Sequence, residues 1–264
     1  NYPNFAYMKF VDTHTHLYLK HFRGERDKII KDAINVGVEK MLLPNINSST
    51  IFTMNQICRR FPKNCFAMIG LHPCDVKEHT IKKELKNIEE KLKKENYIAI
   101  GEIGIDLFWD KTTLELQKEA FRFQIELAKK YNLPIAIHIR NYFNEAFEIV
   151  NDMNDMNLFG VFHCFTGDKN TANKIINLGG FYLGIGGVLT FKNSGLKKTI
   201  KKIDLNHLVL ETDSPFLAPT PYRGKRNESK YIVNIAEKLA EIHQVSIKEV
   251  AEFTTKNALE LFKL

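Results

Sequence analysis

Two histidines near the start of the chain, His14 and His16, are separated by one residue in the sequence FVDTHTHL, residues 10–17. Side chains alternate between the two faces of a β-strand, so a strand over these residues would place both imidazoles on one face. Two imidazoles on one face are half of a metal site. An isolated pair of this kind also fits ordinary polar residues at the end of a strand, so the choice depends on what the rest of the chain supplies.

Further polar residues lie near the C-terminal ends of other predicted strands: Asn45, His72, Glu102, His138, His163 and Asp213. In a parallel barrel all of these strand ends converge on one face, where the catalytic groups of such barrels lie. Imidazole together with carboxylate suits Zn²⁺ or Mn²⁺, whereas Mg²⁺ prefers more oxygen ligands and water. A single catalytic zinc takes about three protein ligands. The larger set found here therefore favours a pair of divalent ions with a bridging carboxylate.

The strands and helices that must position these residues alternate along the whole chain. The predicted strands are residues 10–17, 40–46, 65–73, 98–106, 134–140, 160–165, 181–187 and 207–215. The predicted helices are residues 26–35, 48–60, 81–94, 112–131, 143–154, 169–178, 194–202, 228–242 and 247–262. Two of the helices begin at sequences typical of a capping box, Thr112 with Glu115 and Ser246 with Glu249.

This alternation predicts an α/β fold of the (β/α)8 TIM-barrel class, formed by residues 1–264 as one domain. Eight strand–helix units in about 250 residues match that fold in number and size. The strand runs are hydrophobic on both faces, as a parallel sheet covered by helices requires. A doubly wound open sheet would use the same alternation, and the polar strand ends favour the barrel over it.

Composition limits the class of protein and its partners. Hydrophobic residues make up 44% and charged residues 26% of the chain, which predicts a globular protein with a sizeable core and excludes disorder. The net charge of +7 favours an anionic partner such as nucleic acid or an acidic surface. The four cysteines form no CxxC pair, which favours free thiols in a reducing compartment.

The sequence also bears on location and on protein partners. No run approaches the roughly 18 apolar residues that span a bilayer, and no basic segment followed by an apolar one opens the chain. We therefore expect a cytoplasmic protein with no membrane partner and no obligate protein partner. A nuclear or secreted protein stays open, because the chain begins at Asn1 and a leader could have been removed.

Two further segments concern the substrate. The sequence YRGKRN, residues 222–227, follows the eighth predicted strand, and Gly184, Gly186 and Gly187 close the seventh. Phosphate sites in barrels are often built from the loops at these two positions. Arg223 could make bidentate contacts with a phosphate, and the glycines would let backbone approach it closely. The alternative is that Arg223 belongs only to a turn beside a surface basic cluster.

Seven sequence blocks, in their order along the chain, resemble the TatD family of metal-dependent deoxyribonucleases, within the amidohydrolase-like barrels. The resemblance runs from about residue 10 to the C-terminus. The blocks are FVDTHTHL, GLHP (70–73), GEIGID (101–106), the pattern Gln117, Phe121 and Gln124 leading to LPIAIHIR (133–140), HCFTG (163–167), GIGG (184–187), and ETDSPFLAP (211–219) with RGKRN (223–227). Cys74 follows Pro73, where the family often has a second histidine or an aromatic residue, so no substrate contact is implied there.

The resemblance implies a two-metal nuclease that cuts DNA, with 3′ to 5′ exonuclease action or a DNase role in DNA repair or DNA degradation. Carried over by position, His14 and His16 would hold the first ion, Glu102 would bridge, His138 and His163 would hold the second, and Asp213 would bind the first ion and accept a proton from the nucleophilic water. His72 and Arg223 are candidates to hold the phosphate or to protonate the leaving oxygen. The physiological metal is left open among Mg²⁺, Zn²⁺ and Mn²⁺.

Two other functions are compatible with the same residues. A metal-dependent amidohydrolase or esterase would direct the same hydroxide at a carbonyl of a small molecule or an aminoacyl ester. A non-catalytic barrel would bind nucleic acid and keep its metals for structure. Glu102, where many amidohydrolases use a carboxylated lysine, and the basic residues 223–226 favour DNA as the substrate over the first alternative. The complete ligand set favours an enzyme over the second.

Overall fold

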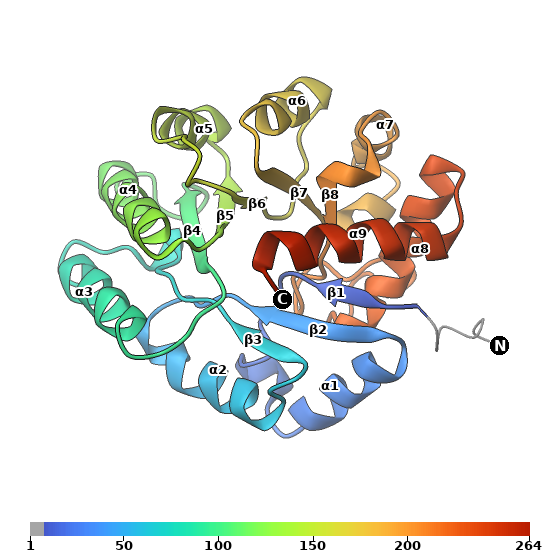
Figure 1. Cartoon of the computed structure of the whole chain (residues 1–264), viewed down its shortest axis with the longest axis horizontal. Coiled ribbons are helices and arrows are strands. Elements are labelled where there is room, and N and C mark those ends of the chain that lie inside the picture. The colour runs from blue at the N-terminus through green and yellow to red at the C-terminus, as the bar shows by residue number, and fades with distance from the viewer. Residues whose placement is uncertain (1–7) are drawn as a thin grey trace.

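The structure is a computed structural model that describes residues 8–264, and in this part of the chain parallel strands form a barrel inside a ring of helices (Figure 1). The strands are β1 (Phe10–Asp12), β2 (Val38–Leu43), β3 (Cys65–Ala67), β4 (Ile100–Asp106), β5 (Ile135–Arg140), β6 (Gly160–Phe162), β7 (Phe181–Ile185) and β8 (Leu208–Leu210). Strands that follow one another in sequence lie side by side and form hydrogen bonds, in two sheets of order β1-β2-β3 and β4-β5-β6-β7-β8. Two isolated bridges complete the circle, Ile69 with Ile100 and Thr15 with Ser214. The predicted barrel is therefore confirmed.

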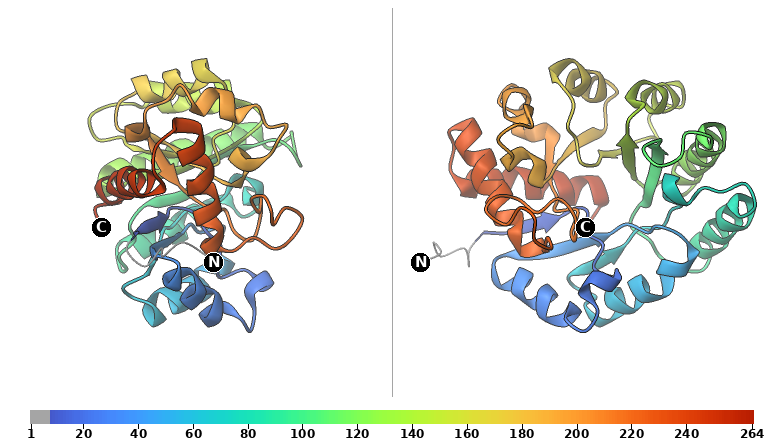
Figure 2. Two further views of the ribbon diagram at one scale, coloured as in Figure 1. Left: turned by 90° about the vertical axis from the view of Figure 1, so that its right-hand side faces the viewer. Right: turned by 180° about the vertical axis from the view of Figure 1, so that it is seen from behind.

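The helices cover the outside of this barrel, as the turned views also show (Figure 2). They are α1 (Arg26–Asn35), α2 (Ser48–Arg60), α3 (Ile81–Leu92), α4 (Leu114–Tyr131), α5 (Phe143–Asp152), α6 (Lys169–Asn177), α7 (Leu196–Ile200), α8 (Ile232–His243) and α9 (Ile247–Phe262). Helix α3 shows the pattern that places them: Ile81, Leu85, Ile88 and Leu92 are buried on one stripe, and its lysines face solvent. Among the described residues, none of the helices has the length and apolar character needed to cross a membrane.

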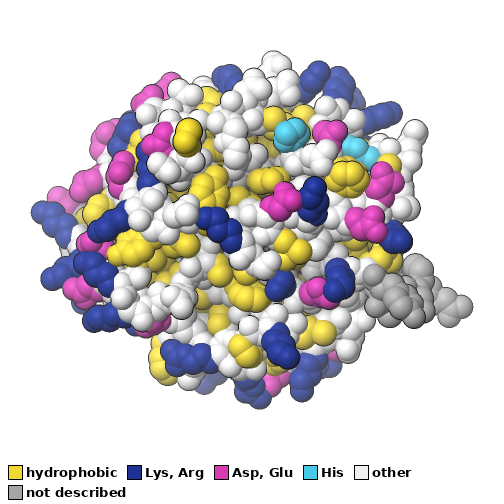
Figure 3. All heavy atoms as spheres, viewed as in Figure 1, with side chains coloured by type: hydrophobic (Ala, Val, Ile, Leu, Met, Phe, Trp, Pro, Cys, Tyr) yellow, Lys and Arg dark blue, Asp and Glu magenta, His cyan; other side chains and the backbone are white. Residues whose placement is uncertain are grey.

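The interior of the barrel is a separate apolar cluster closed at one end by α9. Strand residues such as Val11, Leu42 and Val209 pack there against Ala258, Leu261 and Phe262 of α9. The side chain of Asn257 donates hydrogen bonds of 2.8 Å to the carbonyl oxygens of Leu205 and Leu208, at the start of β8. Helix α9 therefore covers the N-terminal ends of the strands. The face that carries α9 has basic and acidic side chains interspersed (Figure 3), and the C-terminal strand ends lie on the opposite side.

Several predicted boundaries were wrong. The strands predicted at 10–17, 65–73, 160–165 and 207–215 end earlier, because the chain beyond β1, β3, β6 and β8 no longer forms a continuous ladder with one neighbour. Beyond β6 and β8 the backbone also turns, with a positive φ at Cys164 and at Asp213. The capping box predicted at Thr112 is absent: α4 begins at Leu114, and the Thr112 hydroxyl donates to Asp110 instead. At the other predicted cap, the Ser246 hydroxyl accepts a hydrogen bond from the Glu249 amide, as expected.

Candidate metal centre

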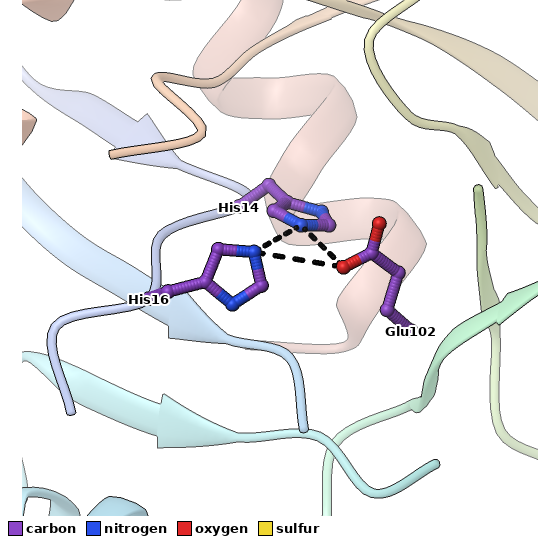
Figure 4. A group of neighbouring side chains, drawn as sticks. All are labelled: His14, His16 and Glu102. Carbon is purple, nitrogen blue, oxygen red and sulfur yellow. Dashed lines mark hydrogen bonds and ion pairs between the residues drawn. The ribbon is translucent and has the colours of Figure 1, made fainter. Parts of the chain in front are cut away.

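The two histidines that follow β1 point toward each other and toward Glu102 of β4 (Figure 4). Strand β1 ends at Asp12, but the extended backbone continues because it bonds to alternate neighbours: the Thr15 amide donates to Leu42 and the His16 amide to Ser214. The Nε2 atoms of His14 and His16 lie 3.2 Å apart. The two imidazoles therefore lie on one side of the chain, as predicted. Hydrogen bonds of the segment after β1 hold them there, because the strand itself ends at Asp12.

Glu102, buried within β4, lies between two groups of ligands. Its Oε2 atom lies 3.2 Å from Nε2 of His14 and 3.5 Å from Nε2 of His16. Its Oε1 atom faces the other way, 2.8 Å from Nδ1 of His138 and 3.6 Å from Nε2 of His163. One carboxylate thus presents one oxygen to each of two histidine pairs.

Asp213 completes the group around Oε2. Its Oδ1 atom lies 3.4 Å from Nε2 of His16 and 3.9 Å from Nε2 of His14. The residue has a positive φ of 56°, which is unfavourable for a side chain other than glycine and is typical of positions constrained by function. Hydrogen bonds from the Asp213 amide to the His14 carbonyl and from Asn227 Nδ2 to the Phe216 carbonyl hold this turn. The six predicted ligands therefore converge, and their role as ligands stays a prediction.

The hydrogen bonds of His16 fix which of its nitrogens carries a proton. The Tyr18 hydroxyl donates its only proton to the Pro44 carbonyl at 2.6 Å, so its oxygen accepts from Nδ1 of His16 at 2.8 Å. The neutral ring then has its lone pair on Nε2, which faces His14 and Glu102. This is the tautomer that a metal ligand requires.

His138 and His163 are each paired with a second carboxylate. Nε2 of His138 lies 2.8 Å from Oδ2 of Asp106, and Nδ1 of His163 lies 3.0 Å from Oε1 of Glu211. Burial disfavours both imidazolium ions, but the carboxylates outweigh it and raise the pKa of His138 to about 9 and that of His163 to about 10. Carboxylate–histidine pairs of this kind orient the histidine ligands of metal sites.

The remaining charges match a cation site. Burial would raise the pKa of Glu102, but His14 and the other neighbouring histidines lower it well below its usual value, so the group is a carboxylate. The pKa of Asp213 is also lowered: burial opposes the shift, and the adjacent His16 together with His163 and His14 overcomes it. Burial lowers the pKa of His14, which favours the neutral ring. A neutral His14 beside ionised carboxylates fits the donor set of a divalent cation, and His138 and His163 would each release a proton on binding it.

Two buried ring nitrogens and a buried carboxylate oxygen that lack a well-formed hydrogen bond are also compatible with a cation site. Nδ1 of His14 and Nδ1 of His163 are buried and have no hydrogen bond of good geometry, and neither has Oε2 of Glu211. Native proteins leave few buried polar atoms in this condition, and an ion is one ordinary explanation. Three overlapping groups could hold one: His14, His16 and Glu102; His72, Glu102 and His138; and His14, His163 and Glu211. The residues present therefore fit metal binding.

His72, predicted as a substrate contact, lies at the edge of this cluster. Its Nδ1 accepts the Cys74 amide hydrogen at 3.1 Å, so the neutral ring carries its proton on Nε2, which lies 3.7 Å from Oε1 of Glu102. Burial, together with the nearby His138 and His16, lowers the pKa of His72 to about 3. The ring is thus a neutral hydrogen-bond donor facing the centre.

Arg223, the residue predicted to contact a phosphate, does not contact the histidine cluster in the part of the chain that the structure describes. The guanidinium of Arg223 stacks over the Phe191 ring at 4.2 Å, and no contact with the histidine cluster is found among residues 8–264. The space beside Gly184 is filled by another part of the chain, because a Cβ there would overlap the Glu211 carboxylate. A Cβ at Gly187 would overlap the Leu217 carbonyl oxygen. These two glycines let Glu211 and the loop after β8 pack closely against β7, and an approach of their backbone to a phosphate stays a prediction.

Four buried polar residues of the centre were missed by the sequence analysis: Asp12, Tyr18, Asp106 and Glu211. Asp12 accepts hydrogen bonds from the amide and hydroxyl of Thr212, so it ties β1 to the chain after β8. Asp106 and Glu211 orient His138 and His163 as described above. Their spacing in the sequence could have indicated two of them. Asp106 follows Glu102 by four residues and Glu211 precedes Asp213 by two, so a strand would place each on the same face as a predicted ligand.

Comparisons with known proteins agree with this geometry. The family model described as TatD related DNase matches residues 11–263. A protein of Bacillus subtilis (strain 168) named as the uncharacterized metal-dependent hydrolase YabD is 38% identical over 254 residues, which covers 96% of this chain and 98% of that protein. A Buchnera aphidicola hydrolase with a similar name, BU355, is 35% identical and covers 97% of this chain and 100% of that protein. The crystal structure of YJJV, a TatD homologue from Escherichia coli K12, is 28% identical with a TM-score of 0.90, covering 97% of this chain and 98% of that one.

Proposed function

The chain belongs to the TatD-related DNase family and is a metal-dependent hydrolase, and from this premise we propose that it hydrolyses DNA phosphodiester bonds with two divalent ions. The ions would be Zn²⁺, Mn²⁺ or Mg²⁺. We further propose 3′ to 5′ exonuclease action, in DNA repair or DNA degradation. The net charge of +7 supports a polyanionic substrate.

The position of Glu102 is the observation that carries this proposal. Its two oxygens face different histidine pairs, and Asp213 adds a second carboxylate to one of them. A bridging carboxylate between two sites is the arrangement by which paired ions act on phosphodiesters. In the proposed site His14, His16 and Asp213 would hold one ion, His138 and His163 would hold the other, and Glu102 would be shared.

The chain's own residues supply the remaining steps. Bound ions would lower the pKa of a water toward about 7 and stabilise negative charge on the phosphoryl oxygens. Asp213 is ionised and its Oδ1 atom faces the histidines, so it can accept the proton of the attacking water. His72 presents its Nε2 proton to the same space and can donate a hydrogen bond to a phosphate oxygen; its neutral ring has no acidic proton to give to the leaving oxygen.

The proposal is tested by digesting end-labelled single-stranded and duplex DNA with protein that has been stripped of metal and then given Mn²⁺, Zn²⁺ or Mg²⁺. Wild type should release mononucleotides from 3′ ends only when metal is present. Glu102→Gln and Asp213→Asn should lower the rate by at least roughly 10²-fold while circular dichroism shows folded protein. Glu84→Gln, which changes a carboxylate on the outer helix α3, is the matched control.

A panel of aminoacyl esters and amides in the same assay separates a nuclease from an esterase. Cleavage of DNA with no turnover of the esters supports the proposal. Turnover of esters or amides with intact DNA, or undiminished cleavage by both carboxylate variants, would contradict it.

A further inference from the structure

Exposed aromatic and aliphatic side chains gather around the metal centre. Seven large hydrophobic side chains are exposed within residues 8–264: Phe52, Phe108, Trp109, Tyr142, Met156, Phe216 and Leu217. Five of them, all except Phe52 and Met156, belong to the loops that follow β4, β5 and β8. These loops surround the C-terminal strand ends, where the ligands converge. Exposed apolar groups concentrated around a polar site indicate a surface that binds something.

Phe108 and Trp109 form an aromatic pair directly after β4. Their ring centroids lie 4.8 Å apart and the rings are nearly perpendicular, at 87°. Phe108 is 47% exposed and Trp109, the only tryptophan of the chain, is 77% exposed. Burying such a ring in the protein core would be favourable. The exposed faces of the pair are therefore available to a flat apolar ligand.

Arg140, the last residue of β5, stands beside this pair. Its guanidinium lies 3.5 Å from the centroid of the Phe108 ring. Arg140 follows His138 by two residues in the same strand, so both side chains belong to the same face of the sheet. The salt bridges among the described residues do not include Arg140. An exposed guanidinium without a carboxylate partner matches a phosphate, which it can hold through two parallel hydrogen bonds.

One carboxylate ties the aromatic pair to the metal centre. Oδ1 of Asp106 accepts the Phe108 amide hydrogen at 2.9 Å, and Oδ2 of the same group lies 2.8 Å from Nε2 of His138. The pair is thus held close to a predicted metal ligand. A chain whose phosphate lies at the metal centre would pass beside these rings.

We propose that Phe108, Trp109 and Arg140 form a nucleotide subsite for an unpaired stretch of DNA. Trp109 stacks against a base next to the scissile phosphate, and Arg140 pairs with a neighbouring backbone phosphate. Stacking of bases on aromatic side chains tolerates any sequence, because every base has a π-face. The subsite rests on the proposed nuclease function and adds the contact that selects unpaired nucleotides.

The first experiment measures binding without cleavage, in EDTA. The emission of Trp109 is followed during titration with an eight-nucleotide oligothymidylate and with an abasic octamer that has the same number of phosphates. The oligothymidylate should quench Trp109 saturably, and the abasic strand should bind more weakly and quench little. Equal quenching by both strands, or none by either, would overturn the stacking contact.

Variants are compared by the anisotropy of labelled oligonucleotides. Phe108→Ala/Trp109→Ala should weaken oligothymidylate binding roughly ten-fold and abasic binding little, and Trp109→Tyr should restore most of the loss. Arg140→Gln should weaken the binding of both oligonucleotides and lower the slope of log affinity against log salt concentration by about one.

Two control variants change similar side chains on the outer helices. Phe52→Ala on α2 removes an exposed aromatic ring and Arg122→Gln on α4 removes an exposed guanidinium, and both should bind as wild type. Thermal melts confirm that each variant is folded.

Cleavage by the wild type with Mn²⁺ separates failure of the subsite from failure of the nuclease. If DNA is cut but the subsite variants bind both strands as wild type does, the subsite is wrong and the nuclease stands. If the binding differences appear but no DNA is cut, the subsite is supported and the nuclease is wrong. If DNA neither quenches Trp109 nor is cut, both are overturned.

Discussion

At the scale of single residues, carboxylates outside the predicted ligand set control how well the centre can bind a cation. Asp106 holds His138 from behind, on the side away from Glu102. Asp106→Asn should therefore lower the affinity for Mn²⁺ by roughly 10- to 100-fold, measured by calorimetry. Asp110→Asn removes a nearby carboxylate that only caps Thr112, and its metal affinity should equal that of wild type. Equal affinities in both variants would show that Asp106 does not position the histidine.

The raised pKa values of His138 and His163 give a pH dependence to the metal-free protein. Both values, about 9 and about 10, exceed the unfolded value of about 6.5, so the folded state binds these protons more tightly. Their stabilisation is fully present below about pH 6.5 and is lost as the pH rises through 9 to 10. In EDTA the melting temperature should fall by roughly 5–10 °C between pH 6.5 and 10.

A variant and a metal titration check this assignment. His138→Gln lacks one of the two groups, so its melting temperature should depend less steeply on pH over the same range. A cation must displace the same protons, so the apparent affinity for Mn²⁺ should rise across this window. A wild-type melting temperature that rises with pH in EDTA would contradict the assignment.

The sequence indicated which candidate ligands would come together but not the carboxylates behind them, for a physical reason. His14, His16 and Glu102 could be identified because each has the residue type of a ligand at a strand end. The pairing of Asp106 with His138 depends on the register between β4 and β5, in which Gly104 lies opposite His138. That register is set by packing across the whole barrel, so one sequence does not reveal which carboxylate contacts which histidine.

At the scale of elements, the close approach of β4 and β5 depends on Gly104. This residue has a φ of 143°, and a Cβ atom there would overlap the His138 carbonyl oxygen. Gly104→Ala should therefore displace β5, destabilise the protein and weaken metal binding together, as measured by melts and calorimetry. Gly24→Ala also has a positive φ but its Cβ would meet open space, so it should cost only about 1 kcal/mol of stability and leave metal affinity unchanged. Similar effects from both substitutions would exclude a special role for the contact of Gly104 with His138.

Helices were predicted more accurately than strand ends. Each long helix carries an apolar stripe at helical spacing, as in α3, and such a stripe determines where the helix lies and which face it buries. The chain beyond β3 also looks like strand because it is apolar, and the chain beyond β1 does so because threonine and histidine alternate there. Its hydrogen bonds go to alternate neighbours, so Thr15 bonds to Leu42 while His16 bonds to Ser214. Local sequence does not encode such a change of partner.

At the scale of the whole molecule, the metal centre joins strands from all around the barrel. Its predicted ligands come from the chain after β1, from β4 and β5, and from the chain after β6 and β8. A cation bound there contacts segments up to about 200 residues apart in sequence, and these contacts exist only in the folded chain. Binding to the folded state alone stabilises it by about 2.7 kcal/mol when free metal is 100 times its dissociation constant.

Metal should therefore raise the melting temperature of the wild type by roughly 5–10 °C over protein in EDTA. Glu102→Gln should lose most of this shift, because Glu102 is the ligand shared by both histidine pairs, and the control Glu84→Gln should keep it. If Glu102→Gln kept the full shift but lost DNA cleavage, Glu102 would act on the substrate and would not bridge. If stabilisation and cleavage disappear together, both effects would arise from metal held by Glu102, at the C-terminal ends of the strands.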